Sequence, residues 1–180
     1  MLAAALLEQG HRRFAVLRGP GTVVTAADRT TGFVSALEQS GVEPVVVIET
    51  TFDRDGGFDG ARQLVRQGLA GSDPLCVFAT NEVMAIGAMA AFREAGLDIP
   101  QEVQVAGFDD IPTLRSRPAG SLPRPDHGPA AVGGDGPAIV EMAMSTDARP
   151  GAAAVERVPA EVILRDSTRL PKHPLVFDTG

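Results

Sequence analysis

Four short apolar runs, each followed by a stretch with helical spacing, constrain the fold more than any other feature of the sequence. The runs are rich in β-branched residues and cover residues 14–17, 45–48, 75–79 and 103–108. Near-continuous apolar strands of this kind are typical of a parallel sheet that is covered on both faces. The alternation therefore predicts an α/β fold, a parallel-sheet three-layer sandwich. The residues at helical spacing, and the glycines expected to end helices, are Phe33, Leu37, Ala61, Leu64, Val65, Val83, Ile86 and Ala90, with Gly10, Gly41 and Gly96.

The size and charge of the chain limit both its architecture and its partners. Its 180 residues are 44% hydrophobic, which is enough for one compact α/β unit. The formal net charge is −7 and the sequence has no Lys/Arg-rich run, so we expect no direct contact with DNA phosphates from these residues. The single cysteine, Cys76, lies inside an apolar run and is predicted to be a reduced core thiol.

The start of the chain predicts a short helix over residues 1–8 that ends at Gly10. This stretch has no basic segment ahead of its apolar residues and is too short to span a bilayer. We therefore expect a cytoplasmic protein without membrane contact.

Residues 117–136 break the pattern because they are rich in proline and glycine and poor in large apolar side chains. We expect neither a stable helix nor a strand there. A helix is predicted to resume over residues 138–144, and a last strand is predicted within residues 158–168. Residues 169–180 are expected to form a tail.

Five motifs occur in an order that resembles the effector-binding domain of LacI/GalR-type transcriptional regulators. They are residues 10–16 (GHRRFAV), 28–33 (DRTTGF), 80–87 (TNEVMAIG), 107–110 (GFDD) and 159–168 (PAEVILRDST). The resemblance implies a periplasmic-binding-protein-like type I lobe. In that family a helix-turn-helix and a hinge precede two lobes, and a sugar or nucleobase effector binds between the lobes.

The resemblance also implies a division of the chain. Residues 1–118 and 155–168 match the C-terminal lobe of the family, and residues 119–154 match a segment that crosses into the N-terminal lobe and back. The family carries a Leu-Thr-Thr-Val-like strand in that crossover, whereas this chain has Pro123 in the corresponding stretch, and proline removes a ladder donor. The helix-turn-helix and most of the N-terminal lobe have no counterpart in the sequence.

Three polar residues are candidates for effector binding by this resemblance. Arg29 is expected at the start of a helix, where its guanidinium would donate to ligand hydroxyls or a carboxylate, and a solvated arginine is the alternative. Asp109 follows a strand and would accept from sugar hydroxyls, or it serves as a turn or cap residue. Asn81 either contacts the ligand or caps the helix that begins near Glu82.

Two further candidates lie in loops. The aromatic ring of Phe52, after the second strand, would stack on a sugar or base, or it packs over a helix end. The Thr25 hydroxyl would bind a ligand or cap the following helix.

The resemblance maps a dimer interface to Ile86, Ala90, Leu114 and Arg117. The apolar members of this set would otherwise be core residues, and the sequence leaves both interpretations open.

Catalytic and metal-dependent functions are not indicated. The histidines His11, His127 and His173 are scattered, without metal-ligand spacing or a nucleophile motif, and residues 19–22 lack the pattern of a phosphate loop. The acidic residues Asp53, Asp55 and Asp59 are interpreted as partners of a helix dipole. We expect no metal and no cofactor.

The leading hypothesis is a fragment of a LacI-type regulator that senses a small polar effector, such as a sugar or nucleoside-like molecule. We expect a homodimer that contacts DNA only through a helix-turn-helix outside this sequence. The alternatives are a solute-binding protein of a sugar importer and a dimerisation module without ligand binding.

Overall fold

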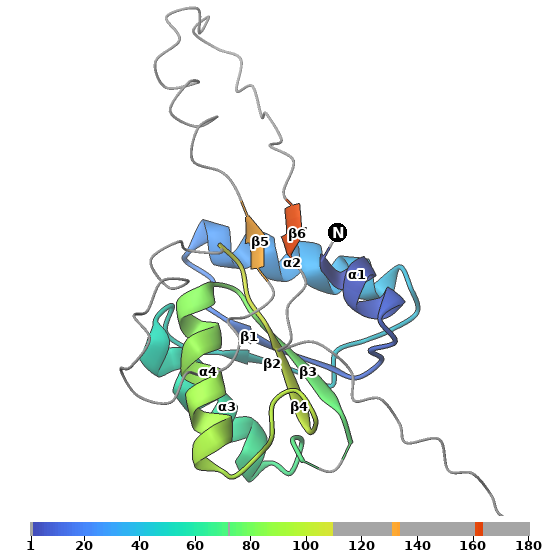
Figure 1. The fold of residues 1–180 in the computed structure, drawn as a ribbon. Helices are drawn as coiled ribbons and strands as arrows, with labels where there is room; N and C mark the ends of the chain where they lie inside the picture. Colours follow the sequence, from blue (N-terminus) through green and yellow to red (C-terminus); the bar gives the residue numbers. More distant parts are fainter. Residues whose placement is uncertain (1, 72, 110–130, 134–160, 164–180) are drawn as a thin grey trace, which may run out of the picture.

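Four parallel strands form the central sheet of the computed structural model, which describes residues 2–71, 73–109, 131–133 and 161–163. The strand order is β2-β1-β3-β4 (Figure 1). The register places Ala15 opposite both Val46 and Val77, and Val77 opposite Val105. The strand bounds are β1 (Phe14–Arg18), β2 (Val46–Glu49), β3 (Leu75–Ala79) and β4 (Val103–Ala106).

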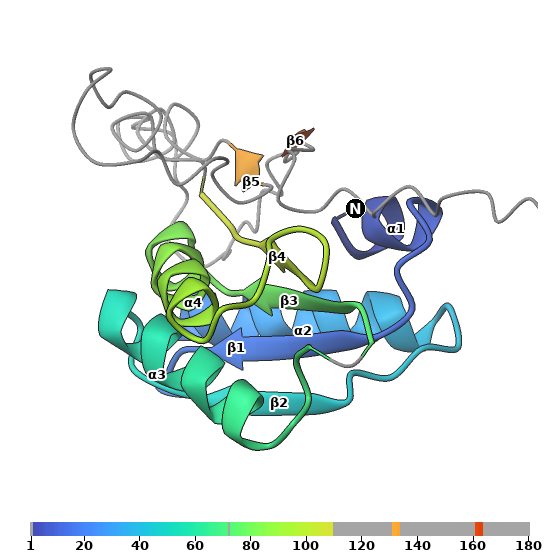
Figure 2. The same ribbon diagram turned by 60° about the horizontal axis from the view of Figure 1, so that its bottom comes forward.

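Helices cover both faces of this sheet, which confirms the predicted three-layer α/β sandwich. α1 (Leu2–Glu8) and α2 (Val24–Glu38) lie on one side. α3 (Arg54–Arg66) and α4 (Glu82–Glu94) lie on the other (Figures 1 and 2). Each helix from α2 to α4 begins beyond the carboxyl end of the preceding strand, so the three helix starts gather at one edge of the sheet.

The strands differ in how completely they are buried. All residues of β3 and β4 are buried, as expected from their near-continuous apolar runs, and the burial includes the polar Gln104 in β4. β2 departs from this expectation: Val47 is 41% exposed and only Ile48 is buried. β2 lies at one end of the sheet and pairs with β1 alone, and the helices cover only part of it. β4 lies at the other end and is buried throughout, so an end position does not by itself expose a strand.

Glycine lets α3 and α4 pack backbone against backbone. A Cβ atom at Gly57 would lie 2.0 Å from the carbonyl oxygen of Met84, and one at Gly87 would lie 2.0 Å from that of Arg54. Real Cβ atoms do not approach backbone oxygens so closely, so only glycine allows this separation of the helices. The core beneath includes Leu17, Leu64, Val77, Met84, Phe92 and Val105.

Aromatic side chains fill the core on the opposite face. Phe33 stacks on Phe78 with ring centroids 4.2 Å apart, and Phe14 meets Phe33 edge-on at 6.0 Å. Cys76 is fully buried in the same core, and burial raises the pKa of its thiol well above the usual range. The prediction that Cys76 is a free thiol in the core is therefore confirmed.

Helix ends close as the sequence predicts. Gly10, Gly41 and Gly96 have positive φ angles of 101°, 72° and 77°. After α4, Gly96 N donates to Arg93 O and Leu97 N donates to Phe92 O, which satisfies the last carbonyls of that helix.

A second, two-stranded sheet corrects the expectation for residues 117–136. β5 (Ala131–Gly133) falls in that stretch and pairs antiparallel with β6 (Glu161–Ile163), which lies in the predicted last strand. β5 has only three residues and ends in a glycine, so neither hydrophobic periodicity nor composition identifies it as a strand in the sequence. The helix predicted over residues 138–144 and the tail over 169–180 lie outside the described residues.

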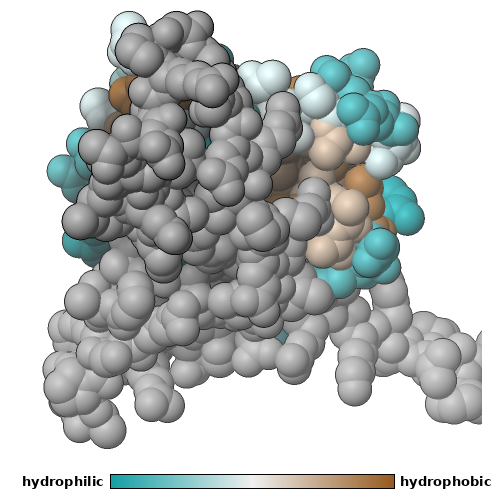
Figure 3. Space-filling view, turned by 90° about the horizontal axis from the view of Figure 1, so that it is seen from above, coloured by the Kyte–Doolittle hydropathy of each residue, from teal (hydrophilic) through white to brown (hydrophobic). Residues whose placement is uncertain are grey.

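The surface of the described residues has few large apolar side chains. Only Val24, Val45 and Val47 are prominently exposed among them. Figure 3 shows one face of the molecule, on which hydrophobic residues of the described part lie beside hydrophilic ones at the right of the view. In the described part of the chain, no helix is long and apolar enough to cross a membrane.

Candidate functional site

The carboxyl ends of β1 and β3 define a topological switch point. After β1 the chain turns to β2 on one side, whereas β3, the other neighbour of β1, leads on to β4. Ligands of open α/β sheets bind in such positions because the loops diverge there. The two loops are joined directly, since Gly19 N donates to Thr80 Oγ1 over 3.2 Å.

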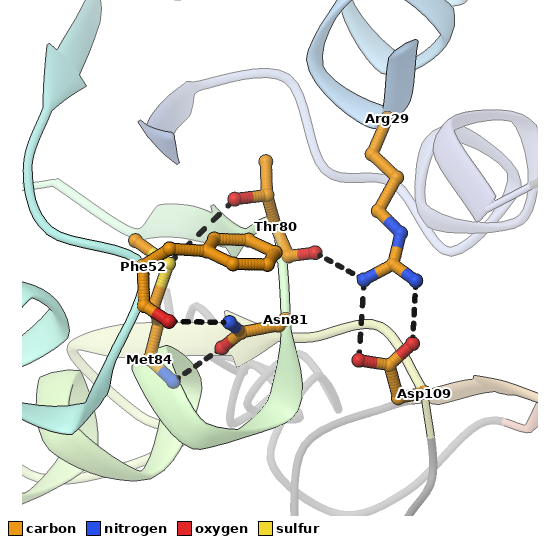
Figure 4. Close-up of polar contacts among 6 residues, drawn as sticks. All are labelled: Arg29, Phe52, Thr80, Asn81, Met84 and Asp109. Atoms are coloured by element: carbon orange, nitrogen blue, oxygen red, sulfur yellow. Dashed lines mark hydrogen bonds and ion pairs between the residues drawn. The ribbon is translucent and has the colours of Figure 1, made fainter. Parts of the chain in front are cut away.

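Arg29 reaches across this edge from α2. Its Nη1 donates to Thr80 O at 3.0 Å and to Asp109 Oδ2 at 3.1 Å, and its Nη2 donates to Asp109 Oδ1 at 2.6 Å (Figure 4). The expectation that Arg29 begins a helix is wrong: α2 begins at Val24, so Arg29 lies in its second turn. The side chain of Arg29 remains 17% exposed.

Asp109 meets Arg29 from the loop after β4. Its φ angle is 100°, and positive φ angles are rare except in glycine and, less often, in asparagine and aspartate. This conformation presents the carboxylate to the guanidinium in a two-point ion pair, with the Asp109 side chain 33% exposed. The ring of Phe108 lies beneath the same guanidinium, 3.9 Å from Arg29 Cζ. Strained backbone held by such contacts is common at functional sites.

Asn81 and Thr80 take structural positions at the start of α4. Asn81 Oδ1 accepts from Met84 N at 2.7 Å, so Asn81 caps the helix, and its Nδ2 donates to Phe52 O at 3.2 Å (Figure 4). The Asn81 side chain is buried and both ends of its amide are engaged. The helix begins at Glu82, as predicted.

Phe52 and Thr25 flank the switch point. Phe52 is half-buried against the core of α3 and α4, and its ring lies so close to Gly19 that a Cβ there would be 2.5 Å from Phe52 Cδ2. Thr25 is exposed in the first turn of α2. The suggestion that Thr25 caps this helix is wrong, because the cap is Val23, which makes no side-chain hydrogen bond.

The acidic residues at the start of α3 stabilise that helix. Asp53 Oδ1 accepts from Gly56 N at 2.8 Å and from Thr51 Oγ1 at 2.7 Å. These bonds, the Gly56 amide foremost, lower the pKa of Asp53 below its ordinary value of 3.8. Among the described residues, no group of His, Cys, Asp and Glu side chains could hold a metal ion.

The structure adds partners that sequence reasoning missed. Phe108 stacks under Arg29, and Arg18 Nη2 lies 2.6 Å from Glu49 Oε2 at the ends of β1 and β2. The contact of Phe108 with Arg29 could have been predicted, because Phe108 precedes Asp109, which was already a candidate. Nothing local signals the second, because it depends on which strands are neighbours.

The residues assigned to a dimer interface divide between described and undescribed parts. Ile86 and Ala90 are partly exposed on α4 and belong to neither core. Leu114 and Arg117 lie outside the described residues.

The fold and this edge define a class of protein: an open parallel α/β lobe whose polar residues converge at the switch point. A model of the periplasmic binding protein-like domain matches residues 3–168. The chain therefore belongs to the periplasmic binding protein-like family, and within it to the effector-binding domains of LacI-type regulators.

Curated relatives of known name agree with this placement. The chain is 32% identical over 112 residues to the HTH-type transcriptional repressor PurR of Pasteurella multocida, a match covering 61% of this chain and 33% of the relative. It is 34% identical over 113 residues to the ribose operon repressor of Haemophilus influenzae, covering 62% and 33%. The chain thus spans about a third of the length of the curated relatives that it matches.

Solved structures share the fold. A sugar-binding LacI-family transcriptional regulator from Escherichia coli, solved with phosphate, superposes with a TM-score of 0.71 at 27% identity, covering 91% of this chain and 57% of that one. The lac repressor dimer bound to operator and the anti-inducer ONPF gives a TM-score of 0.74 at 24% identity, covering 92% and 48%.

Proposed function

We propose that this chain is the effector-sensing part of a cytoplasmic LacI-type transcriptional regulator. It binds a small polar molecule, sugar-like or nucleoside-like, at the carboxyl edge of the sheet. The observation that carries the proposal is the partly exposed pair of Arg29 and Asp109 at the switch point. The names of the relatives, two repressors and a sugar-binding regulator, support the same class. DNA contact belongs to a part of the regulator that these residues do not supply.

The roles of the candidate residues follow from their contacts. Arg29 and Asp109 contact the ligand, because each keeps exposed surface and unused hydrogen-bonding capacity. Phe52 supplies an apolar face beside them, and Thr25 an exposed hydroxyl. Asn81 positions the loop of Phe52, since its amide is engaged by Phe52 O and Met84 N.

The ligand would act on regulation by favouring one arrangement of the domain over another. A bound molecule shifts a conformational equilibrium only by its difference in affinity for the two states. We place residues 1–118 and 155–168 in the lobe that carries the site, and residues 119–154 in a crossover segment. We assign residues 169–180 to a tail.

A thermal-shift screen of the full chain against sugars, nucleosides, nucleobases and sugar phosphates tests the proposal. A ligand that binds the folded state raises the melting temperature. We expect Arg29→Ala and Asp109→Ala to abolish the shift and Arg66→Ala, an exposed arginine in the last turn of α3, to retain it. A cooperative melt that no ligand shifts would reject ligand sensing by this chain.

We also propose that α4 contributes to a homodimer, because Ile86 and Ala90 are apolar, partly exposed and outside both cores. Leu114 and Arg117 would extend the same interface. Sedimentation analysis should show a dimer that Ile86→Asp dissociates and Val47→Asp, an exposed apolar position on β2, does not. A monomeric wild-type chain would reject this interface.

A further inference from the structure

β2 is the least covered strand of the central sheet. Among the described residues no strand pairs with its outer side, and Val47 is 41% exposed, whereas β4 at the other end is buried throughout. We infer that β2 accepts an added strand from a partner protein, an extended segment that is apolar at its centre and carries lysine or arginine at its ends. The inference goes beyond the proposed effector sensing and does not depend on it.

The outer edge of β2 offers backbone groups for pairing. Val45 N, directly before the strand, donates to Phe14 O at 2.7 Å, and β2 then runs in parallel register with β1. Because the direction of the backbone groups alternates along a strand, the N–H groups of Val46 and Ile48 point away from β1. Such edge groups are a template for a further strand, and proteins that bind extended peptides use them in this way.

The side chains of β2 leave an apolar surface next to that edge. Val45 is 46% exposed and lies two positions before Val47, so both point to the same face of the sheet. This is the face of α1 and α2, because Val47 lies opposite Val16, which belongs to the core beneath those helices. Val46 and Ile48 instead pack on the core of α3 and α4. A strand added beside β2 would cover both exposed valines with its own apolar side chains.

The sequence of β2 also suits an added strand. Edge strands are commonly protected by lysine, by proline or by a bulge, and β2 contains neither lysine nor proline within its bounds. Three of its four residues are β-branched, which favours extended backbone. The strand itself therefore does not oppose pairing on its outer side.

The charges around β2 favour a basic partner. Residues 30–53 contain no lysine or arginine, and Glu43 and Glu49 are exposed at the two ends of the strand. Arg18 pairs with Glu49 at 2.6 Å, which leaves Glu43 to act on a partner. The helix dipoles do not reverse this balance. The negative end of α2 precedes Glu43, and at the positive end of α3 the carboxylate of Asp53 accepts from Gly56 N.

The same charges disfavour a second copy of this chain as the occupant. Antiparallel pairing of two β2 strands about a twofold axis would bring the Glu43 end of one strand against the Glu49 end of the other. Like charges opposite each other in a sheet are destabilising. A separate segment with basic ends avoids this repulsion and gains attraction in its place.

Amide hydrogen exchange with a model peptide tests the inference on the full chain. The probe is Lys-Val-Thr-Val-Thr-Val-Lys with blocked ends, and exchange is followed residue by residue by NMR. At saturation we expect the Val46 and Ile48 amides to exchange roughly tenfold more slowly, because they gain hydrogen bonds. The Val45 amide already bonds to Phe14 O and should change little, so it is an internal control.

Two control peptides test the chemistry of the partner by fluorescence anisotropy. Glutamate in place of both end lysines should weaken binding by about tenfold at low ionic strength, and added salt should narrow the difference. Proline in place of the central valine removes a backbone donor and disfavours pairing, so it should abolish binding.

A substitution on the strand tests the location of the contact. Val47→Lys removes an exposed apolar side chain and adds a charge that repels the probe, so binding should weaken by about tenfold. Val24→Lys makes the same change on α2, where the valine is 70% exposed, and should leave the affinity unaltered. Circular dichroism verifies that both variants are folded.

The outcomes separate this inference from the alternatives. No binding of the probe, or protection that spares the Val46 and Ile48 amides, would overturn it. Equal affinity for the lysine and glutamate peptides would overturn the basic class of partner. If both amides are protected without peptide and lose that protection on dilution, the occupant is a second copy and the inference is wrong. None of these results bears on effector binding, which the thermal-shift screen decides separately.

Discussion

The two helical layers cover the same sheet by different means. α3 and α4 approach backbone to backbone through Gly57 and Gly87, whereas α1 and α2 leave room for the stacked rings of Phe33 and Phe78. The first layer depends on the absence of side-chain atoms, and the second on the presence of large ones. The candidate site draws on both, since Arg29 belongs to α2 and Asn81 begins α4. The geometry of the site therefore depends on how α2 and α4 each pack against the sheet.

The largest effect is expected where the layers differ most, at the glycine contact. Gly87→Ala would place a Cβ 2.0 Å from Arg54 O, so α3 and α4 must separate, and we expect a loss of about 5 kcal/mol of unfolding free energy, at the upper end of single substitutions. Gly32→Ala in α2 is the matched control, because nothing lies within 4 Å of its Cβ. That control should stabilise the chain by up to about 1 kcal/mol through helix propensity. Urea denaturation measures both, and equal effects of the two variants would refute the contrast between layers.

The aromatic core gives the next largest effect. Phe78 is 2% exposed and stacks on Phe33, so Phe78→Ala removes a filled volume that the surroundings can close only in part. We expect a loss of about 4 kcal/mol. Phe58→Ala on α3 deletes the same atoms from a half-buried ring and should cost less than half as much. A similar cost for both in urea denaturation would mean that the stacked rings do not dominate their layer.

The starts of the helices extend the comparison to the site. Asn81→Ala removes the cap of α4 and the bond to Phe52 O, and we expect a loss of about 1–2 kcal/mol. Asn81→Asp retains the acceptor for Met84 N but sets a carboxylate oxygen against Phe52 O, so it should recover only part of that loss. α2 has no side-chain cap, and Val23→Asn should therefore add up to about 1 kcal/mol. If Val23→Asn does not raise the stability in thermal denaturation, a side-chain cap at the start of α2 contributes nothing to the free energy of unfolding.

The sequence predicted the layers because it records burial directly. The runs at β1, β3 and β4 are apolar apart from Arg18 at the end of β1 and the buried Gln104 in β4, and the glycines that end the helices require positive φ angles. The half-exposed β2 could not be read in the same way. Its apolar run resembles the others, and its exposure depends on how far the helices cover each end of the sheet, since β4 is also an end strand and is buried.

The residues of the site could be nominated from the sequence, but their contacts could not. Arg29 and Asp109 are 80 positions apart, and their ion pair depends on the loop after β4 adopting a positive φ. Asn81 had two open interpretations, and the bonds to Met84 N and Phe52 O show that it caps α4. The sequence also did not indicate the close approach of α3 and α4 at Gly57 and Gly87, because glycines inside helices follow no periodic pattern.

The smallest expected effect concerns the cap of α3 and its dependence on pH. The hydrogen bonds from Gly56 N and Thr51 Oγ1 stabilise the ionised Asp53, so its pKa is lower in the folded chain than in the unfolded one. The folded state thus binds this proton less readily, and the cap contributes fully above the ordinary pKa of 3.8. The contribution is lost as the pH falls through the lower pKa of the folded state. Asp53→Asn keeps a capping oxygen but cannot titrate. Its free energy of unfolding should therefore fall less than that of the wild type when denaturation is measured at pH values above and below the pKa of folded Asp53. If the free energies of unfolding of the two chains fall in parallel with pH, the ionised cap of α3 adds nothing beyond a neutral one.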